Sequence, residues 1–348
     1  MKTGDRRSET GKQTRPEDRA ALIQGALFIA GPTAVGKTEI ALAVAEACQG
    51  EIVGADAFQV YKGLDLLTAK PSPEELARVP HHLVGLFPLN EPFNVARYLE
   101  AALSAIDNIK KRGKTPVIVG GTGLYIRSLT RGLAETPPSD EALRANLSAT
   151  PLAELLDRLE TLDPVAAAAI DRQNPRRVIR ALEVCLLTGK PFSSFRQEWE
   201  ETPHYAGVLL ERERTELYER IDRRTVAMFE QGVVDEVRAA MEAGVSETAE
   251  QVIGWREIGA LLRGEISEAE CIAAIQQATR KYAKRQLTWF RRETILNPVS
   301  LSPLKALSTH NSEKSPKAQA TSATIRARTR DRTTDDVVTE ILSIFRQS

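Results

Sequence analysis

A short glycine-rich run near the start of the chain has the residue types of a phosphate-binding loop. Residues 31–38 read Gly-Pro-Thr-Ala-Val-Gly-Lys-Thr and fit the pattern G-x-x-x-x-G-K-[ST]. The glycines let the backbone curl so that successive N–H groups point at phosphate oxygens, Lys37 adds a positive charge, and Thr38 offers a hydroxyl to Mg²⁺. An apolar run precedes the loop and a helical pattern follows it, as this chemistry requires. We predict that the loop, called the P-loop below, binds a diphosphate-like or triphosphate-like group; the alternative is a chance glycine-rich turn. Its residues are Gly31, Pro32, Thr33, Ala34, Val35, Gly36, Lys37 and Thr38.

A carboxylate follows the next strand along the chain. Glu51–Val53 is a short strand candidate, and Asp56 lies just beyond its end. Ligands of parallel sheets bind at the carboxyl ends of the strands, so Asp56 is placed to accept a proton from a reacting group. A solvated loop residue or a Walker-B-like metal ligand are the alternatives. Asp65, further along, is expected in a turn or a supporting position.

A basic stretch near residue 285 suits a phosphate backbone. Residues 276–292 contain no acid and six basic residues, with Tyr282, Trp289 and Phe290 between them. At helical spacing, positions 281, 284, 285, 288, 291 and 292 share one face, which favours RNA binding. A solvated helix face is the alternative. The basic residues are Arg280, Lys281, Lys284, Arg285, Arg291 and Arg292.

Short apolar runs alternate with helical patterns over much of the chain. Such alternation, with glycines at the strand ends, predicts an α/β fold: a P-loop NTPase-like parallel sheet flanked by helices. The predicted strands are residues 26–30, 51–53, 115–119 and 206–210, and the predicted helices are 39–47, 93–111, 213–243 and 268–290.

The same patterns divide the chain into parts. Residues 1–24 read as a flexible leader, and residues 25–132 and 200–296 as a catalytic core with C-terminal RNA-binding helices. Residues 133–199 carry helical spacing with no strand-like run, which predicts a helical insertion domain. Residues 297–348 read as a linker and a short terminal helix.

The composition sets limits on the kind of protein. The chain has 348 residues, 42% of them hydrophobic, and 47 basic residues balance 47 acidic ones. This composition is that of an ordinary globular protein, and the chain has no net positive charge that would attract a polyanion such as nucleic acid. Three cysteines without CxxC spacing argue against a disulfide framework or a zinc site. With no signal-peptide core and no apolar run near 20 residues, we expect a cytoplasmic protein without a membrane segment.

An ordered set of blocks resembles the tRNA dimethylallyltransferases. Besides the P-loop, the matching stretches start at residues 55, 80, 93, 119, 174, 253 and 282, and together they cover about residues 26–295. The sequence departs from the family pattern at Gly54, Ala57, Phe58 and Leu67, where serines, a smaller apolar residue and a glycine are usual. Because of these departures, the sequence does not fix which hydrogen bonds the protein makes to the target base.

The resemblance implies a prenyl transfer. The P-loop would grip the pyrophosphate of dimethylallyl diphosphate with Mg²⁺ at Thr38, and the acceptor would be N6 of the adenosine just 3′ to the anticodon in a tRNA anticodon stem-loop. Asp56 would be the general base, and Arg220 would hold the pyrophosphate, with Arg224 as a second choice for that role. The implied catalytic residues are therefore Asp56, Thr38 and Arg220, in a protein that we expect to be a monomer.

The resemblance also implies a tRNA-binding set, part of which reads the base and part of which contacts the stem-loop. It consists of Asp56, Ala57, Phe58, Gln59, Thr122, Arg144, Gln173, Asn174, Pro175, Arg176, Arg177, Gln251, Val252, Ile253, Gly254, Trp255, Arg256, Lys284, Arg285, Gln286, Leu287, Thr288, Trp289, Phe290 and Arg291. Because some of these residues lie in residues 133–199, the resemblance implies that the helical insertion domain contacts tRNA. Thr122 could instead serve only its strand-to-helix turn. For Arg220 or Arg224 alone, a solvated helix face is an equal alternative. His81 and His82 lack metal-ligand partners nearby in the sequence, which favours a structural role.

Two other functions fit part of the sequence. A small-molecule kinase that places ATP in the P-loop explains Lys37, Thr38 and Asp56, but not the basic stretch. A non-catalytic RNA-binding module with a decayed P-loop explains the basic stretch, but not the intact Gly-Lys-Thr and Asp56.

Overall fold

The computed structural model describes residues 16–195, 205–293, 296–302 and 332–347. These residues fall into two compact units. The first consists of residues 1–130 and 203–348, and the second of residues 131–202.

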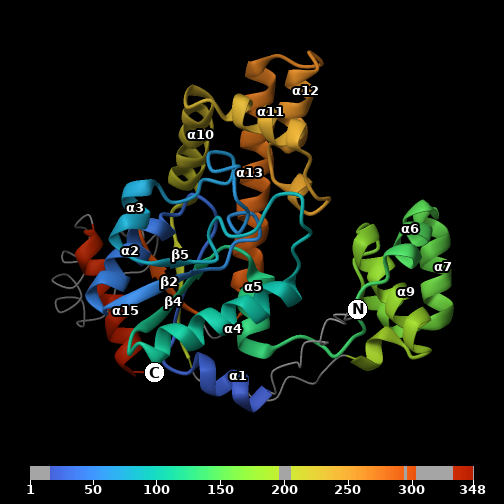
Figure 1. Ribbon diagram of the computed structural model, residues 1–348, viewed down its shortest axis with the longest axis horizontal. Helices are drawn as coiled ribbons and strands as arrows, with labels where there is room; N and C mark the ends of the chain where they lie inside the picture. The colour runs from blue at the N-terminus through green and yellow to red at the C-terminus, as the bar shows by residue number, and fades with distance from the viewer. Residues whose placement is uncertain (1–15, 196–204, 294–295, 303–331, 348) are drawn as a thin grey trace, which may run out of the picture. The chain divides into compact units, whose positions relative to one another are not determined.

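A six-stranded sheet forms the centre of the first unit (Figure 1). Its strand order is β3-β2-β4-β1-β5-β6, and every neighbouring pair is parallel. The predicted α/β class with a parallel sheet is therefore confirmed, and the two edge strands, β3 and β6, were not predicted. The strands are β1 Leu27–Ala30, β2 Gly50–Gly54, β3 His81–His82, β4 Thr115–Gly120, β5 Ala206–Glu211 and β6 Asn297–Ser300.

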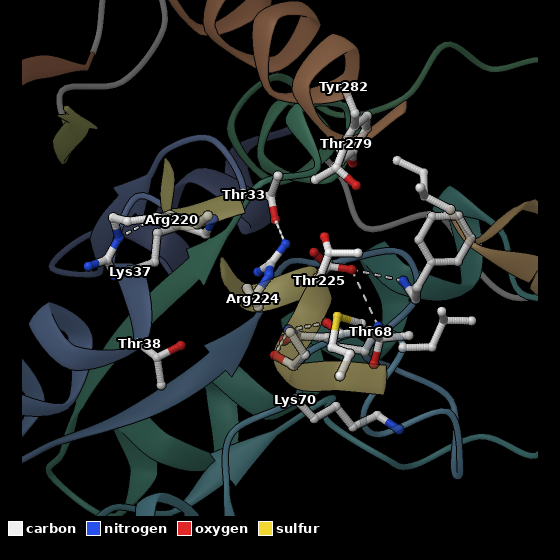
Figure 2. A pocket seen from close by; sticks show the side chains of 18 of the residues that line it. Thr33, Lys37, Thr38, Thr68, Lys70, Arg220, Arg224, Thr225, Thr279 and Tyr282 are labelled. Atoms are coloured by element: carbon white, nitrogen blue, oxygen red, sulfur yellow. Dashed lines mark hydrogen bonds between the residues drawn. The ribbon is translucent and has the colours of Figure 1, made fainter. Parts of the chain in front are cut away.

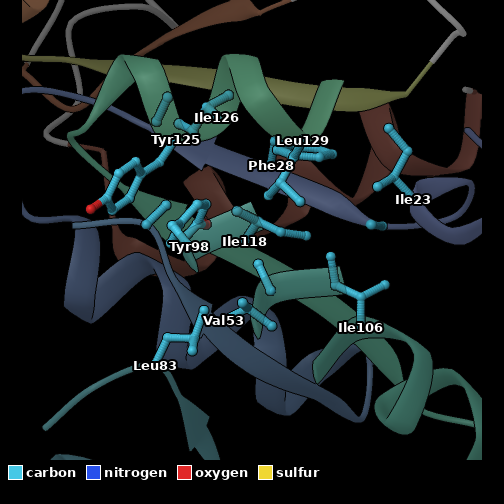
Figure 3. Packing of buried hydrophobic residues seen from close by; sticks show 14 of the residues in the cluster. Ile23, Phe28, Val53, Leu83, Tyr98, Ile106, Ile118, Tyr125, Ile126 and Leu129 are labelled. Carbon is cyan, nitrogen blue, oxygen red and sulfur yellow. The ribbon is translucent and has the colours of Figure 1, made fainter. Parts of the chain in front are cut away.

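Helices cover both faces of this sheet because the buried strands are apolar on both sides. Side chains alternate along a strand, so in β1 Phe28 and Ala30 join one core cluster while Leu27 and Ile29 join the other. The first cluster packs under α1, α4 and α5 (Figure 3) and the second under α2, α10 and α15. These helices are α1 Pro16–Ile23, α2 Lys37–Ala47, α4 Val95–Lys111, α5 Gly123–Arg131, α10 Arg214–Glu230 and α15 Thr334–Gln347, and the short α3 is Pro73–Arg78.

The helix predicted over residues 213–243 is two helices. α10 ends at Glu230 and α11 (Val233–Ala243) begins after Gly232, whose φ of 93° lies in the left-handed region. A glycine reaches that region without steric cost, so the chain turns there and the prediction of one helix was wrong. The helix predicted over residues 268–290 is confirmed as α13 (Glu268–Phe290).

A third apolar cluster joins α11, α13 and the short helix α12 (Trp255–Leu262) to the loop after Asp56. The short element η2 (Ala249–Gln251) precedes α12, and its Ala249 belongs to the first cluster. Trp255 and Val237 are buried in the third cluster, and so are Leu64 and Leu67 of the loop after Asp56. The cluster therefore fixes the loop of residues 64–70 against the helices.

The two ends of the chain are more ordered than the sequence indicates. Within the predicted leader, residues 16–23 form α1, and Ile23 is buried in the core. Within the predicted linker, residues 297–300 form β6. The terminal helix α15 packs against α2, with Val337 and Ile341 buried (Figure 1). Residues 1–15 and 303–331 lie outside the described part of the chain.

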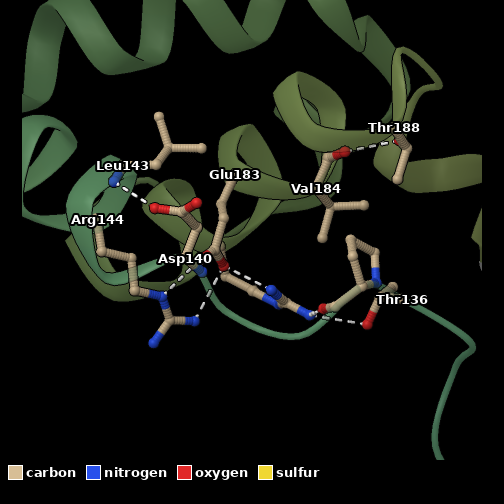
Figure 4. A network of polar contacts seen from close by, with 9 residues as sticks. Thr136, Asp140, Leu143, Arg144, Glu183, Val184 and Thr188 are labelled. Carbon is tan, nitrogen blue, oxygen red and sulfur yellow. Dashed lines mark hydrogen bonds and ion pairs between the residues drawn. The ribbon is translucent and has the colours of Figure 1, made fainter. Parts of the chain in front are cut away.

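The second unit consists of helices in its described part, residues 131–195. A buried carboxylate organises it: Glu183 accepts hydrogen bonds from Arg144 at 2.9 Å, from Arg180 and from the Asp140 N–H (Figure 4). Burial would raise the pKa of Glu183, but these hydrogen bonds outweigh it and hold the pKa below its ordinary value. The elements are α6 Glu141–Ala149, α7 Leu152–Leu162, α8 Pro164–Ala169, α9 Pro175–Thr188 and η1 Phe192–Phe195.

None of the described helices is long and apolar enough to cross a membrane.

Candidate functional site

A cavity of about 660 Å³ opens in the first unit at the carboxyl ends of the strands. One part of its wall is polar and comes from the P-loop, Asp56 and α10, and another part is apolar and comes from Leu67, Ile253 and Ile275. Its polar and apolar walls suit a ligand with a charged head and a hydrocarbon tail. The lining residues include Thr33, Lys37, Thr38, Asp56, Phe58, Gln59, Thr68, Lys70, Arg220, Arg223, Arg224, Met228, Val252, Thr279, Tyr282 and Gln286, several of which appear in Figure 2.

The P-loop connects β1 to α2 with the curled backbone that the motif predicts. Ala34 and Gly36 have φ values of 64° and 109°, both in the left-handed region. The Lys37 ammonium donates to the carbonyl oxygens of Gly31 at 3.1 Å and Pro32 at 2.8 Å. Because an ammonium has three donors, one remains for a ligand.

Lys37 is partly buried, which changes its protonation. Burial lowers the pKa of Lys37 to about 8, with the Asp56 carboxylate opposing this shift and the Arg224 guanidinium adding to it. Lys37 is therefore mostly charged at neutral pH and has lost part of its hydration, so a bound phosphate would replace water as its partner.

Two arginines of α10 add to this positive surface. Arg220 Nε donates to the Ala34 carbonyl at 2.8 Å, and Arg224 Nη2 donates to Thr33 Oγ1 at 2.7 Å (Figure 2). Burial lowers the pKa of Arg224, and the Asp56 carboxylate opposes that shift. The spacing of four residues puts both guanidinium groups on one helix face, so both predicted arginines reach the P-loop.

Asp56 lies two residues past the end of β2 and faces the same cavity. Its Oδ1 accepts from the N–H groups of Phe58 at 3.0 Å and Gln59 at 3.3 Å, which closes a tight turn. The carboxylate thus has a fixed orientation, and it lies close enough to Lys37 and Arg224 to affect both. The structure brings the predicted proton acceptor and the predicted phosphate cradle into one cavity.

The Gln59 side-chain amide donates its hydrogen bonds within the protein. It donates to the carbonyl oxygens of Thr68 at 3.1 Å and Ala69 at 2.9 Å. From the other side, the Glu236 carboxylate accepts from the N–H groups of Leu66 and Leu67, each at 2.9 Å. Gln59 therefore holds the loop of residues 64–70 and has only its amide oxygen left for a base.

Thr122 does not line the cavity but supports the Asp56 turn. Its hydroxyl accepts from the Ala57 N–H at 3.0 Å. This contact agrees better with the alternative role of Thr122, in the strand-to-helix turn, than with direct orientation of the base.

The basic stretch of α13 has two faces. The side chains predicted to share a face, at positions 281, 284, 285, 288, 291 and 292, are all exposed. By contrast, Gln286 and Phe290 are 6% and 1% exposed, while Leu287 and Trp289 are partly buried and pack against the core clusters. Gln286 and Phe290, both predicted as tRNA contacts, therefore face the protein interior, because only one side of a helix packed on a core can face solvent.

The remaining predicted tRNA residues occupy two places. In residues 251–256, Val252 and Ile253 line the cavity, Trp255 is buried, and Arg256 is exposed. In the second unit, Arg144 is engaged with Glu183, while Asn174 caps α9 and accepts from the Arg177 N–H at 3.4 Å. The exposed residues there are Gln173, Pro175, Arg176 and Arg177.

The paired histidines have structural contacts. His82 Nε2 lies 2.7 Å from the Glu51 carboxylate, and His81 Nδ1 lies 2.7 Å from the Val79 carbonyl. Across the described ranges, no cluster of three or more His, Cys, Asp and Glu side chains could hold a metal ion.

Sequence reasoning missed three residues that shape the site. Gln286 was assigned to RNA, Tyr282 was noted only as an interleaved aromatic, and Glu236 was not considered. For Tyr282 and Gln286 the available signal was helical spacing: they lie four residues apart and share a face that the basic positions do not occupy.

Comparisons with known proteins agree on one family. The model of the IPP transferase family matches residues 59–293. The curated tRNA dimethylallyltransferase of Geobacter sulfurreducens is 46% identical over 300 residues, 83% of this chain and 94% of that protein. The one from Akkermansia muciniphila is 43% identical over 277 residues, 80% of this chain and 94% of that protein.

Two solved structures have the same fold. The full-length tRNA isopentenylpyrophosphate transferase from Bacillus halodurans is 33% identical with a TM-score of 0.63, covering 93% of this chain and 98% of that one. A eukaryotic dimethylallyltransferase, described as acting on tRNA, is 27% identical with a TM-score of 0.69, covering 89% of this chain and 81% of that one.

Proposed function

This chain belongs to the IPP transferase family, and we propose that it prenylates tRNA. It transfers a dimethylallyl group from dimethylallyl diphosphate to N6 of the adenosine just 3′ to the anticodon and releases pyrophosphate. The observation that carries this proposal is that the P-loop and Asp56 line one cavity that also has an apolar wall.

The diphosphate of the donor binds at the P-loop. Lys37, Arg220 and Arg224 are the cations around it, and they would balance the charge that the departing pyrophosphate gains. Partial burial of these groups strengthens their attraction for phosphate, because water screens them less. The dimethylallyl tail then lies along the apolar residues, among them Leu67 and Ile253.

Asp56 acts on the acceptor. As the bond from N6 to the allylic carbon forms and the carbon–oxygen bond to the diphosphate breaks, the amine nitrogen gains positive charge and gives its proton to the Asp56 carboxylate. The two N–H bonds to Oδ1 orient that carboxylate before the substrate arrives.

The residues present also fit Mg²⁺. This ion keeps several waters and needs few protein ligands when phosphate oxygens complete its shell, so the hydroxyl of Thr38, the last residue of the P-loop, would suffice. When bound, Mg²⁺ would offset negative charge on the leaving diphosphate.

The exposed basic face of α13 is the proposed tRNA surface in the first unit. Lys281, Lys284 and Arg285 project from it, and no acidic residue follows Glu270 within the helix; Arg292 lies just past its end. Such a face binds RNA by contacts to its phosphates, whereas the target base must be unstacked to reach Asp56.

Mass spectrometry of tRNA nucleosides tests the function. After incubation of unmodified tRNA with dimethylallyl diphosphate and Mg²⁺, we expect an adenosine with one added dimethylallyl group. ATP turnover is measured in parallel. Robust ATP hydrolysis or metabolite phosphorylation without any prenylated nucleoside would favour a kinase and contradict the proposal.

We further propose that the protein works as a monomer in the cytoplasm. All three cysteines, Cys48, Cys185 and Cys271, are free thiols, as a reducing compartment would maintain. Sedimentation at working concentration tests the monomer, and fractionation of cells tests the location.

A further inference from the structure

One face of α13 packs on the turn between β4 and α5, residues 120–123. Tyr282, Gln286 and Trp289 follow each other at spacings of four and three residues, so they share this face. Two glycines of the turn make room for them. A Cβ on Gly121 would lie 2.3 Å from Gln286 Nε2, and one on Gly123 would lie 2.2 Å from Trp289 Cε3.

The Gln286 amide bridges this turn to the P-loop. Its oxygen accepts from the Thr33 N–H at 2.9 Å, and its nitrogen donates to the Gly121 carbonyl at 2.9 Å. The side chain is 6% exposed, so the loss of either bond would leave a largely buried polar group with little access to water. One buried amide therefore joins two loops on different strands, β1 and β4.

The turn of residues 120–123 in turn supports the proton acceptor. The Thr122 N–H donates to the Ala55 carbonyl at 3.1 Å, and its hydroxyl accepts from the Ala57 N–H at 3.0 Å. These bonds hold the backbone on both sides of Asp56. A continuous hydrogen-bonded path thus runs from the phosphate cradle through Gln286 and Thr122 to the Asp56 turn.

From this path we propose that Gln286 is a positioning residue and not an RNA contact. It holds the P-loop, where the donor's diphosphate binds, at a fixed position relative to Asp56. This inference rests on the proposed prenyl transfer. The geometry matters because nucleophile, allylic carbon and leaving oxygen must align, and a misplacement of about 1 Å costs about 100-fold in rate.

The test compares Gln286→Met with Gln277→Met, the same substitution at an exposed position of the same helix. Methionine keeps the length of the side chain and removes both hydrogen bonds. Four quantities are measured: kcat, KM for dimethylallyl diphosphate, the Kd of tRNA without donor, and the Kd of inorganic pyrophosphate with Mg²⁺.

We expect Gln286→Met to lower kcat/KM for the donor about 100-fold and to weaken pyrophosphate binding, while the Kd of tRNA changes less than twofold. Gln277→Met should leave all four quantities unchanged. A loss of tRNA affinity with normal pyrophosphate binding would overturn the inference, and so would an equal loss of every quantity together with a lower Tm.

A second variant and a second measurement cover two cases in which the first comparison alone gives no answer. If Gln286→Met does not fold, Gln286→Glu keeps the acceptor for Thr33 but removes the donor to Gly121, and the same split between catalysis and tRNA affinity is expected. If the wild-type protein prenylates no tRNA, the proposed function fails, but pyrophosphate binding still decides the role of Gln286 at the P-loop.

Discussion

Replacing Asp56 by asparagine separates the charge of this residue from its place in the fold. In the wild-type turn, Oδ1 accepts the N–H groups of Phe58 and Gln59. The amide oxygen of asparagine accepts both bonds with the same geometry, so the turn should persist. What Asp56→Asn removes is the proton acceptor and one negative charge close to Lys37 and Arg224.

The size of the effect follows from these two losses. A positioned general base contributes about 10²- to 10⁴-fold to a rate, which corresponds to about 3–5 kcal/mol in the activation free energy. The cradle, however, becomes more positive, because Lys37 and Arg224 lose a compensating carboxylate. We therefore expect kcat to fall 10²- to 10⁴-fold while KM for dimethylallyl diphosphate stays the same or decreases.

Steady-state transfer of a labelled dimethylallyl group to tRNA measures both constants. The matched control is Asp235→Asn, since the Asp235 side chain is 78% exposed and pairs with Arg238, and neither of these residues lines the cavity. Thermal unfolding checks that Asp56→Asn keeps the Tm of the wild type. A kcat within threefold of the wild-type value in a folded Asp56→Asn protein would refute the role of Asp56 as the base.

Three further outcomes are expected. Glu183→Gln removes the buried negative charge that Arg144 and Arg180 share and should destabilise the second unit by about 1–3 kcal/mol at pH 7. Because the folded pKa of Glu183 is lowered, its contribution is present above the ordinary carboxylate pKa and is lost as pH falls through the folded value. Acid titration of unfolding should therefore show less pH dependence in the variant. Leu67→Ala removes a buried side chain and should lower the free energy of unfolding by about 2–5 kcal/mol in urea, and an unchanged midpoint would contradict its packing. Lys284→Ala should weaken tRNA binding and reduce the slope of log K against log salt by about 1, and an unchanged slope would remove this residue from the RNA surface.

The phosphate cradle could be predicted from sequence because its signal is local. The P-loop pattern, the preceding apolar strand and the following helix all lie within about 20 residues, and Asp56 follows the next strand. The parallel sheet was predictable for the same reason: short buried strands read as continuous apolar runs.

The features that could not be predicted from the sequence depend on contacts between residues far apart in the chain. Gln286 meets Thr33 across 253 residues and Gly121 across 165 residues, and in the sequence it stands within a basic run that suggests RNA. The break at Gly232 was missed because the apolar spacing continues on both sides of that glycine. β6 is too short and too polar to be recognised without its partner β5.

The position of α15 against α2 has a consequence for handling the protein. Val337, Val338 and Ile341 shield an apolar strip next to the helix that starts with Lys37. A polypeptide ended at residue 302 would expose that strip to water and should aggregate. A synthetic peptide of residues 332–348, added in trans, should restore solubility, since packing and not covalent connection holds the terminal helix in place.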